Sequence, residues 1–268
     1  MHEKKIDIIE RKLDKERIKT KDSEMLKVIE SVFDFRTSML IVKLMNRDII
    51  SDINFCISTG KEANVYHGLT SDGKEVAIKI YRTTTTEFKR NWIYVQGDPR
   101  FKNFKKGTYS FIYIWAKKEF KNLKRMSKVG VRVPEPIYVQ QNVLVMEFIG
   151  EKQQAAPLLK DVVLKKPEKV YECVIDYMGI LYEKGKMVHA DLSEYNILFF
   201  KNKPIFIDVS QAVLLDHPQA PFFLFRDIVN VNRYFSSLGV KTLPNEELYE
   251  HIVGSPPNPQ VLLSIKDR

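Results

Sequence analysis

Residues 188–208 read VHADLSEYNILFFKNKPIFID, and they place three polar side chains around a short hairpin. Asp191 is followed five residues later by Asn196, and Asp208 comes twelve residues after Asn196. Between Asn196 and Asp208, two apolar runs flank a Lys-Asn-Lys-Pro turn, which is the pattern of two strands joined by a tight connection. The three side chains are therefore expected to converge on one side of this hairpin.

The chemistry of these three side chains points to phosphoryl transfer. Two carboxylates and one amide are hard oxygen ligands that suit Mg²⁺ held against phosphates, with Mn²⁺ as the alternative metal. Phosphoryl transfer needs such a metal together with a base beside the incoming nucleophile. The H-x-D-x-x-x-x-N spacing also suits small-molecule phosphotransferases, and the position of Asp208 makes the pattern more specific. The alternative is a solvated loop that carries its carboxylates by chance.

The composition is that of a folded, basic protein. The chain has 268 residues, 44% of them hydrophobic and 29% charged, which suffices for a core in one domain or two close lobes. A net charge of +9 favours partners with phosphates, although a generally basic proteome would give the same excess. Cys56 and Cys173 sit among apolar residues and are expected in the core. Without a membrane-length apolar run or a signal peptide, a cytoplasmic location is expected.

An alternating apolar pattern opens a β-sheet, with strands expected at 54–57, 64–69 and 75–81. In the third strand Lys79 lies between apolar neighbours and needs an anionic partner, unless it points to solvent from an open sheet face. The turn between the first two strands has small residues that let backbone N–H groups approach phosphate oxygens, an ordinary hairpin turn being the alternative. The residues of this turn are Ser58, Thr59, Gly60, Lys61, Glu62 and Ala63.

A helix predicted at 111–128 supplies a partner for this lysine. Glu119 falls on the inward stripe of the helix, where a lone carboxylate would be costly, so we expect it to pair with Lys79. The basic residues of the helix are expected to form its outer surface. They include Lys117, Lys118, Lys121, Lys124 and Arg125.

Three parts are expected along the chain. Residues 1–50 form an N-terminal helical extension, residues 51–149 a small lobe, and residues 150–268 a second, helical lobe. The polar stretch 82–110 is too long for an ordinary connection and is interpreted as a mobile or functional insertion in the small lobe.

The remaining elements complete the two lobes. Strands at 137–139 and 143–148 complete an antiparallel sheet of five strands. In the second lobe, a first helix is expected to end at Gly185, helices follow near 225–238 and 246–252, and the chain ends in a proline-rich tail.

Taken in chain order, these residues resemble the protein-kinase signature, in which a lysine is tied to a helix glutamate and a catalytic-loop aspartate and asparagine precede a metal-binding aspartate. The chain departs from that signature in several places. The phosphate loop reads STGKEANVYHG, Ala190 precedes the aspartate, Val209 and Ser210 follow Asp208, no Ala-Pro-Glu comes after them, and 60 residues follow Asp208. These departures resemble the RIO family of atypical serine/threonine protein kinases. STGKEANVY, VHADLSEYNIL and IFIDVSQAV are similar to its RIO-one subfamily, and the length is more typical of archaeal than of eukaryotic members.

The resemblance implies an α+β, two-lobed protein-kinase-like fold, with an antiparallel N-lobe sheet, one N-lobe helix and a reduced helical C-lobe. It implies ATP and Mg²⁺ or Mn²⁺ as ligands. Lys79 would hold the α- and β-phosphates and Glu119 would hold Lys79. Asp191 would be the catalytic base, with Asn196 and Asp208 on the metal.

The resemblance also implies the rest of the nucleotide site. Residues 58–63 would cover the triphosphate, and the Glu147 carbonyl and Ile149 N–H would take the adenine edge. Asp208 would accept phosphate as an aspartyl-phosphate, which gives the protein ATPase activity. The 82–110 insertion matches the family's flexible loop, in which Thr108 and Ser110 are candidates for autophosphorylation.

RIO proteins act in the maturation of the small ribosomal subunit, so precursor rRNA and ribosomal proteins are the implied partners. The basic helix surface is expected to contact that RNA, a solvated helix face being the alternative. Two other functions stay open. One is a small-molecule phosphotransferase of the aminoglycoside or choline kinase type, and the other is a catalytically silent binding module on pre-ribosomes.

Overall fold

The computed structural model describes residues 33–83, 91–101 and 108–266. A boundary between two compact units falls after Asp52, and residues 70–73 belong with the first unit. Of the predicted N-terminal extension, residues 1–32 lie outside the described part of the chain. The predicted division between lobes at residues 149 and 150 falls inside the second unit and stays a prediction.

The first unit contains helix α2, Phe35–Met45. The side chain of Asp34 accepts hydrogen bonds from the backbone N–H groups of Arg36 and Thr37, both at 3.1 Å, and so caps the start of the helix. The Ser71 hydroxyl donates to the Asp48 carbonyl at 3.2 Å, which ties residues 70–73 to this unit.

The second unit begins with a five-stranded sheet in the order β1-β2-β3-β5-β4. The strand bounds are Asp52–Thr59 for β1, Ala63–Leu69 for β2, Glu75–Tyr81 for β3, Pro136–Gln140 for β4 and Val143–Glu147 for β5. All five predicted strands are present. The strand β3 pairs antiparallel with β2 and β5, and from Val76 onward every one of its residues is buried. Its unbroken apolar run around Lys79 therefore belongs to a central strand that is covered on both faces.

Helix α4, Thr108–Lys128, packs against β4 and β5. Trp115, Leu123 and Met126 are at most 1% exposed, which confirms the predicted inward stripe. The expectation for Lys118 was wrong: this lysine is 0% exposed, whereas the neighbouring Lys117 is exposed. Position 118 lies three residues after Trp115, on a face that a second layer of chain covers.

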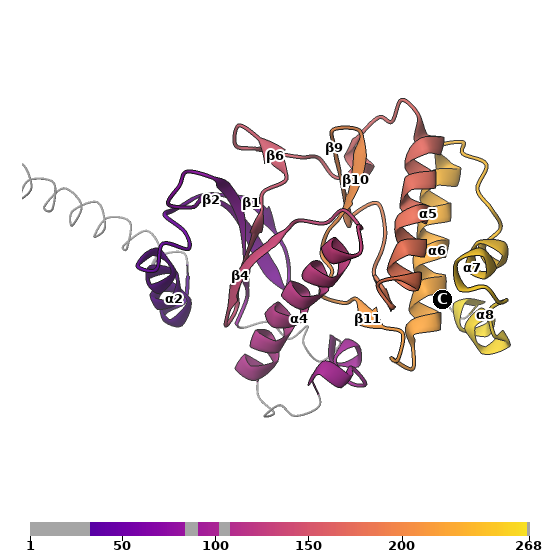
Figure 1. Ribbon diagram of the computed structural model, residues 1–268, viewed down its shortest axis with the longest axis horizontal. Helices are drawn as coiled ribbons and strands as arrows, with labels where there is room; N and C mark the ends of the chain where they lie inside the picture. Colours follow the sequence, from indigo (N-terminus) through magenta and orange to yellow (C-terminus); the bar gives the residue numbers. More distant parts are fainter. Residues whose placement is uncertain (1–32, 84–90, 102–107, 267–268) are drawn as a thin grey trace, which may run out of the picture. The chain divides into compact units, whose positions relative to one another are not determined.

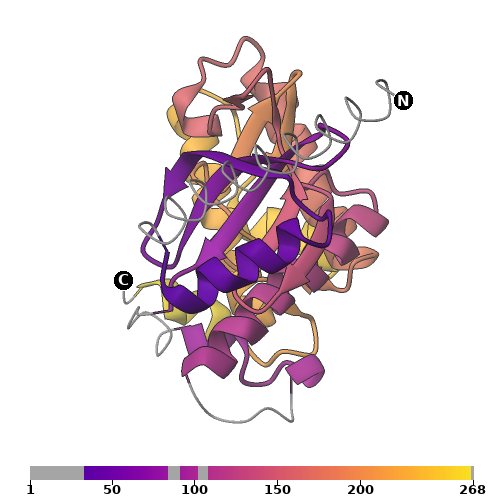
Figure 2. The same ribbon diagram turned by 90° about the vertical axis from the view of Figure 1, so that its left-hand side faces the viewer.

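Residues 91–101, in the middle of the predicted insertion, pack beside α4 (Figure 2). They contain two short 3₁₀ turns, Trp92–Tyr94 and Pro99–Phe101. Arg100 donates to Asp98 and to Asn122 of α4, the latter at 2.9 Å, and the buried His217 ring lies 2.9 Å from the Ile93 carbonyl. The polar appearance of the insertion did not predict this packed segment.

The helical part follows the sheet, with α5 and α6 side by side and α7 and α8 next to them (Figure 1). The bounds are Pro167–Glu183 for α5, Ala220–Ser237 for α6, Asn245–Val253 for α7 and Pro259–Lys266 for α8. The helix α8 replaces the predicted proline-rich tail. Pro259 is its first residue, a position where a missing backbone N–H costs nothing.

Short strand pairs connect these helices. They are β6 (Gly150–Glu151) with β7 (Gln154–Ala155), β8 (Met187–Val188) with β11 (Val213–Leu214), and β9 (Ile197–Phe200) with β10 (Lys203–Phe206). The β9–β10 pair is the hairpin predicted between Asn196 and Asp208, with Phe200 opposite Lys203.

One continuous hydrophobic cluster runs from the sheet into the helical part, and it includes Trp115, Phe206 and Phe235. The expectation that both cysteines lie in the core was wrong: Cys56 is exposed on β1, a strand with mostly exposed side chains, and Cys173 is only partly buried. Within the described part of the chain, no helix combines the length and apolar character needed to cross a membrane. The architecture is α+β, as predicted.

Candidate active site

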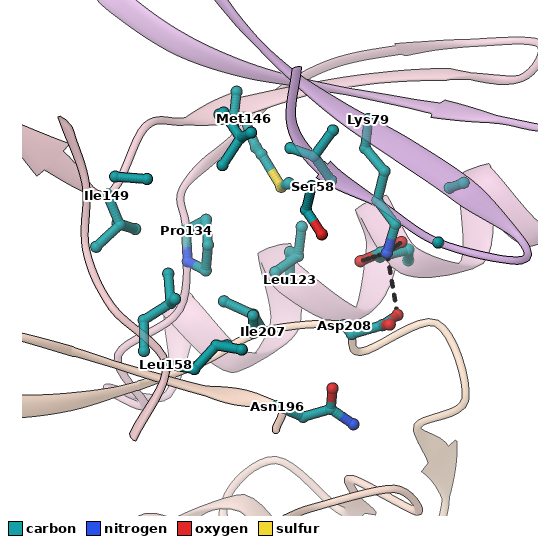
Figure 3. A pocket seen from close by; sticks show the side chains of 18 of the residues that line it. Ser58, Lys79, Leu123, Pro134, Met146, Ile149, Leu158, Asn196, Ile207 and Asp208 are labelled. Carbon is teal, nitrogen blue, oxygen red and sulfur yellow. Dashed lines mark hydrogen bonds and ion pairs between the residues drawn. The ribbon is translucent and has the colours of Figure 1, made fainter. Parts of the chain in front are cut away.

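A cavity of about 550 Å³ lies between the sheet and the β9–β10 hairpin. Apolar side chains gather on one side of it, and a lysine, a carboxylate and an amide on the other (Figure 3). The apolar lining includes Leu123, Pro134, Met146, Ile149, Leu158 and Ile207. A mostly apolar cavity with a few convergent polar groups is the usual form of a small-molecule site.

Lys79 is the centre of the polar side. Its Nζ atom lies 2.9 Å from Glu119 and 3.0 Å from Asp208 Oδ1, so the predicted pair forms and gains a second carboxylate. Burial alone would lower the pKa of Lys79, but the charges of Asp208 and Glu119 raise it above its ordinary value. Burial raises the pKa of Glu119 to about 7 although Lys79 opposes that shift, and Tyr81 donates a further hydrogen bond to Glu119.

The turn between β1 and β2 forms one edge of the cavity. Ser58, Gly60, Lys61, Glu62 and Ala63 line the cavity, and Thr59 does not. The Gly60 N–H donates to the Ala63 carbonyl at 3.0 Å, and a Cβ at Gly60 would lie 2.9 Å from that oxygen, so only glycine fits this turn.

The carboxylate of Glu62 binds side chains of the protein. Trp115 Nε1 donates to it at 3.2 Å and Asn91 Nδ2 at 2.5 Å. Burial raises the pKa of Glu62. Glu62 therefore fastens the turn to α4, a role that its sequence position did not indicate.

Asp191 and Asn196 lie together, as predicted. Asn196 Nδ2 donates to the Asp191 carbonyl at 2.7 Å and to Asp191 Oδ2 at 3.0 Å. Asn196 lines the cavity, whereas Asp191 is not among the lining residues. Burial and the nearby charge of Asp208 raise the pKa of Asp191 to about 6.

Two side chains of α6 hold the loop that carries Asp191, and the sequence analysis did not predict these contacts. Ala190 has the left-handed backbone angle φ 67°, which costs free energy for a residue other than glycine. Buried Asp227 accepts the N–H groups of Ala190 and Leu192 at 2.7 and 2.9 Å, and Arg226 donates to the Ala190 carbonyl. Asp227 lies on the apolar stripe of α6 beside Leu224 and Ile228. The helical spacing that placed Glu119 on the inward stripe of its helix therefore also marks Asp227 as a buried carboxylate in need of a partner.

Asp208 and Asn196 are a donor set that fits a hard divalent cation. Lys79 and the Ser210 hydroxyl both bind Oδ1 of Asp208, and the side chain keeps 49% of its surface exposed, so Oδ2 is left toward the cavity. Asn196 uses its nitrogen on Asp191, which leaves its amide oxygen for a metal. Carboxylate and amide oxygens are the ligands that Mg²⁺ prefers.

Glu147 and Ile149 lie on the other side of the cavity. The Glu147 side chain pairs with Arg132 through contacts of 2.6 and 2.7 Å, and its backbone N–H donates to the Glu135 carbonyl at 2.8 Å. The Ile149 carbonyl accepts the Ala156 N–H at 2.9 Å. The use of the Glu147 carbonyl and the Ile149 N–H by a ligand stays a prediction.

Comparison with known proteins identifies a domain in this chain and similar sequences. Residues 64–248 match the RIO domain. The chain is 46% identical to the serine/threonine-protein kinase rio1 of Schizosaccharomyces pombe, covering 89% of this chain and 49% of that protein. It is 42% identical to the RIO-type serine/threonine-protein kinase Rio1 of Haloferax volcanii, covering 91% of this chain and 84% of that protein. It is also 42% identical to human serine/threonine-protein kinase RIO1, covering 88% of this chain and 44% of that protein.

The fold also has a solved counterpart. The Rio2 kinase from Chaetomium thermophilum, in its ADP/Mg²⁺-phosphoaspartate complex, superposes with a TM-score of 0.64 at 23% identity, covering 86% of this chain and 70% of that one. The chain spans about half the length of the fission yeast and human relatives. The predicted two-lobed, kinase-like fold is confirmed. This chain therefore belongs to the RIO kinase family, in its Rio1 subfamily.

Proposed function

We propose that the chain is an ATP-dependent phosphoryl-transfer enzyme, a RIO-type serine/threonine protein kinase that also hydrolyses ATP. One observation carries the proposal: Lys79 is held 2.9 Å from Glu119 and 3.0 Å from Asp208 on the polar side of a cavity whose other side is apolar. An adenine ring suits the apolar slot, and a triphosphate suits the cation. The names of the Rio1 relatives support the same activity.

Nucleotide binding would use both sides of the cavity. Met146, Ile149 and Ile207 would enclose the adenine, and its edge would meet the Glu147 carbonyl and the Ile149 N–H. Lys79 would bind the α- and β-phosphates, and the turn 58–63 would cover the triphosphate with its backbone N–H groups.

Asp191 would act as the general base. The hydroxyl oxygen of the acceptor, or a water molecule, would form a bond to the γ-phosphorus while the bond from that phosphorus to the β-phosphate oxygen breaks and ADP leaves. The proton of the nucleophile would pass to the Asp191 carboxylate. Asp208 and Asn196 would hold Mg²⁺ or Mn²⁺, which when bound neutralises negative charge on the phosphates.

Asp208 is a further candidate acceptor. Its Oδ2 is left toward the cavity, and carboxylates serve as nucleophiles in enzymes that form aspartyl-phosphates. The Chaetomium Rio2 structure is a phosphoaspartate complex. We infer that Asp208 Oδ2 attacks the γ-phosphorus while the bond from that phosphorus to the β-phosphate oxygen breaks and ADP leaves, which forms an acyl phosphate. Water, giving its proton to Asp191, then attacks this phosphorus, the bond to Oδ2 breaks and inorganic phosphate leaves. This slow ATP hydrolysis exceeds phosphorylation of generic proteins.

The proposed partner is the precursor of the small ribosomal subunit, in the cytoplasm. The net charge of +9 and the exposed lysines at 117, 121 and 124 of α4 support contact with RNA. Lys118 does not belong to that surface, because it is buried.

Mass spectrometry of the purified chain after incubation with ATP tests the proposal. We expect ATP turnover and a label on Asp208 that hydroxylamine removes. Asp191→Ala should abolish turnover by removing the base, and Asp208→Ala should abolish it by removing the metal ligand and the acceptor. Asp216→Ala, at an exposed aspartate, is the matched control. A hydroxylamine-stable label confined to serine or threonine, with fast transfer to an added protein, would instead indicate an ordinary protein kinase.

A further inference from the structure

Gln211, three residues after Asp208, binds the proposed catalytic base directly. Its Nε2 atom lies 3.2 Å from Asp191 Oδ2. A carboxylate only accepts hydrogen bonds, so the nitrogen of the Gln211 amide must be the atom that faces it. Gln211 also lines the cavity and is half-buried.

The bond from Gln211 complements the bond from Asn196. Asn196 Nδ2 donates to the same oxygen, Asp191 Oδ2, at 3.0 Å. Across the described residues, no hydrogen bond uses Asp191 Oδ1. Two donors on one oxygen stop the carboxylate from rotating, and they leave the other oxygen for an incoming proton.

The backbone around Gln211 is fixed from the opposite side by α4. Lys118 Nζ donates to the carbonyls of Ser210, at 2.7 Å, and Ala212. Asn122 Nδ2 donates to the carbonyls of Val209, at 2.8 Å, and Ala212, at 3.1 Å. Lys118 and Asn122 are both 0% exposed. These bonds fix the backbone of residues 209–212, a segment that we call the strap. The Gln211 side chain extends from the strap to Asp191.

We propose that Gln211 is a positioning residue for phosphoryl transfer: together with Asn196 it orients the Asp191 carboxylate so that Oδ1 receives the proton of the attacking hydroxyl or water. This inference deepens the proposed function and rests on it. Gln211 acts through Asp191, so it should affect the chemical step and leave nucleotide binding unchanged.

The test compares Gln211→Leu with Gln219→Leu in the full chain. Leucine is apolar, shorter than glutamine by one atom along the chain, and cannot donate, and Gln219 is an exposed glutamine that does not line the cavity. Since small misplacements of reacting groups cost up to about 100-fold in rate, we expect kcat for ATP turnover to fall about 10- to 100-fold in Gln211→Leu. The KM for ATP and the melting temperature should stay at wild-type values, and Gln219→Leu should match wild type in all three.

A double-mutant cycle separates this role from a structural one. In an Asp191→Asn background, the slow residual single-turnover rates with and without Gln211→Leu should be equal, because the base that Gln211 orients is gone. A further loss in that background would overturn the inference, as would wild-type kcat in Gln211→Leu or a loss that comes only from a raised KM. Wild-type chain without ATP turnover would contradict the proposed function itself, whereas normal wild-type turnover with an unaffected Gln211→Leu contradicts only the role of Gln211.

Discussion

Lys79 is shared by two carboxylates of unequal exposure. Glu119 is 1% exposed and Asp208 is 49% exposed, although both lie within 3.0 Å of the lysine Nζ atom. Glu119 can therefore act as the permanent partner that keeps a cation in the protein interior. Asp208 has a second oxygen to offer to a ligand. The same lysine stabilises the protein interior through Glu119 and holds one oxygen of Asp208 at the cavity.

Replacing Lys79 by methionine should abolish phosphoryl transfer while the protein still folds. The change leaves Glu119 buried without its cation, and breaking a buried ion pair typically costs about 3–5 kcal/mol of unfolding free energy. Glu119→Gln should weaken turnover strongly. Denaturant unfolding and ATP turnover would be measured, with exposed Lys74→Met as the control. Wild-type turnover in Lys79→Met would rule out the role given to this lysine.

At the scale of elements, α4 connects the sheet to the strap that follows Asp208. On one side of α4, Glu119 pairs with Lys79 of β3. Lys118 and Asn122 of the same helix donate to backbone carbonyls within residues 209–212. Burial lowers the pKa of Lys118 well below its ordinary value. An amine at this place can donate to carbonyls that no water reaches, and the orientation of α4 thereby determines the position of Asp208.

Lys118→Met should destabilise the protein more than Lys117→Met. The first change removes the donor to the buried Ser210 carbonyl, and such an unsatisfied group costs about 1–3 kcal/mol, whereas the Ala212 carbonyl keeps its bond from Asn122. The second change alters an exposed side chain on the same helix, where effects are usually within about 0.5 kcal/mol. Urea midpoints of the two variants measure the difference, and equal midpoints would show that the strap does not depend on Lys118.

At the scale of the whole molecule, two buried groups give stability opposite dependences on pH. Burial lowers the pKa of His189 to about 4, and burial raises the pKa of Asp227 to about 7. The unfolded chain protonates His189 below its ordinary value of 6.5, so this group destabilises the fold as pH falls from 6.5 toward 4. The unfolded chain ionises Asp227 above 3.8, so this group destabilises the fold as pH rises from 3.8 toward 7.

Substituting each group should isolate its own contribution to the pH dependence of stability. The free energy of unfolding of wild type minus that of His189→Gln should rise between pH 4 and 6.5, by at most about 1.4 kcal/mol per pH unit for one proton. The same difference for Asp227→Asn should fall between pH 4 and 7. Urea titrations at several pH values measure both differences, and slopes of the same sign for the two variants would contradict the assignment.

Local sequence patterns determined the elements and the residues of the candidate site. Apolar alternation predicted β3 and placed Lys79 inside it, and helical spacing put Glu119 on the inner stripe of α4. The two apolar runs and the turn between Asn196 and Asp208 predicted the β9–β10 hairpin. These predictions succeeded because each depends on residues that share one strand, helix or turn.

Only the tertiary structure decided which polar groups from distant elements meet. Helical spacing could not separate Lys118 from Lys117, because burial of Lys118 depends on the strap that packs over α4 about 90 residues later in the chain. Glu62 meets Trp115, Asp227 meets Ala190 and Gln211 meets Asp191 for the same reason. A local pattern records which face of its own element is apolar, and it holds no information on what covers that face. The packing of the elements provides that cover, and with it the hydrogen bonds that hold the proposed base in place.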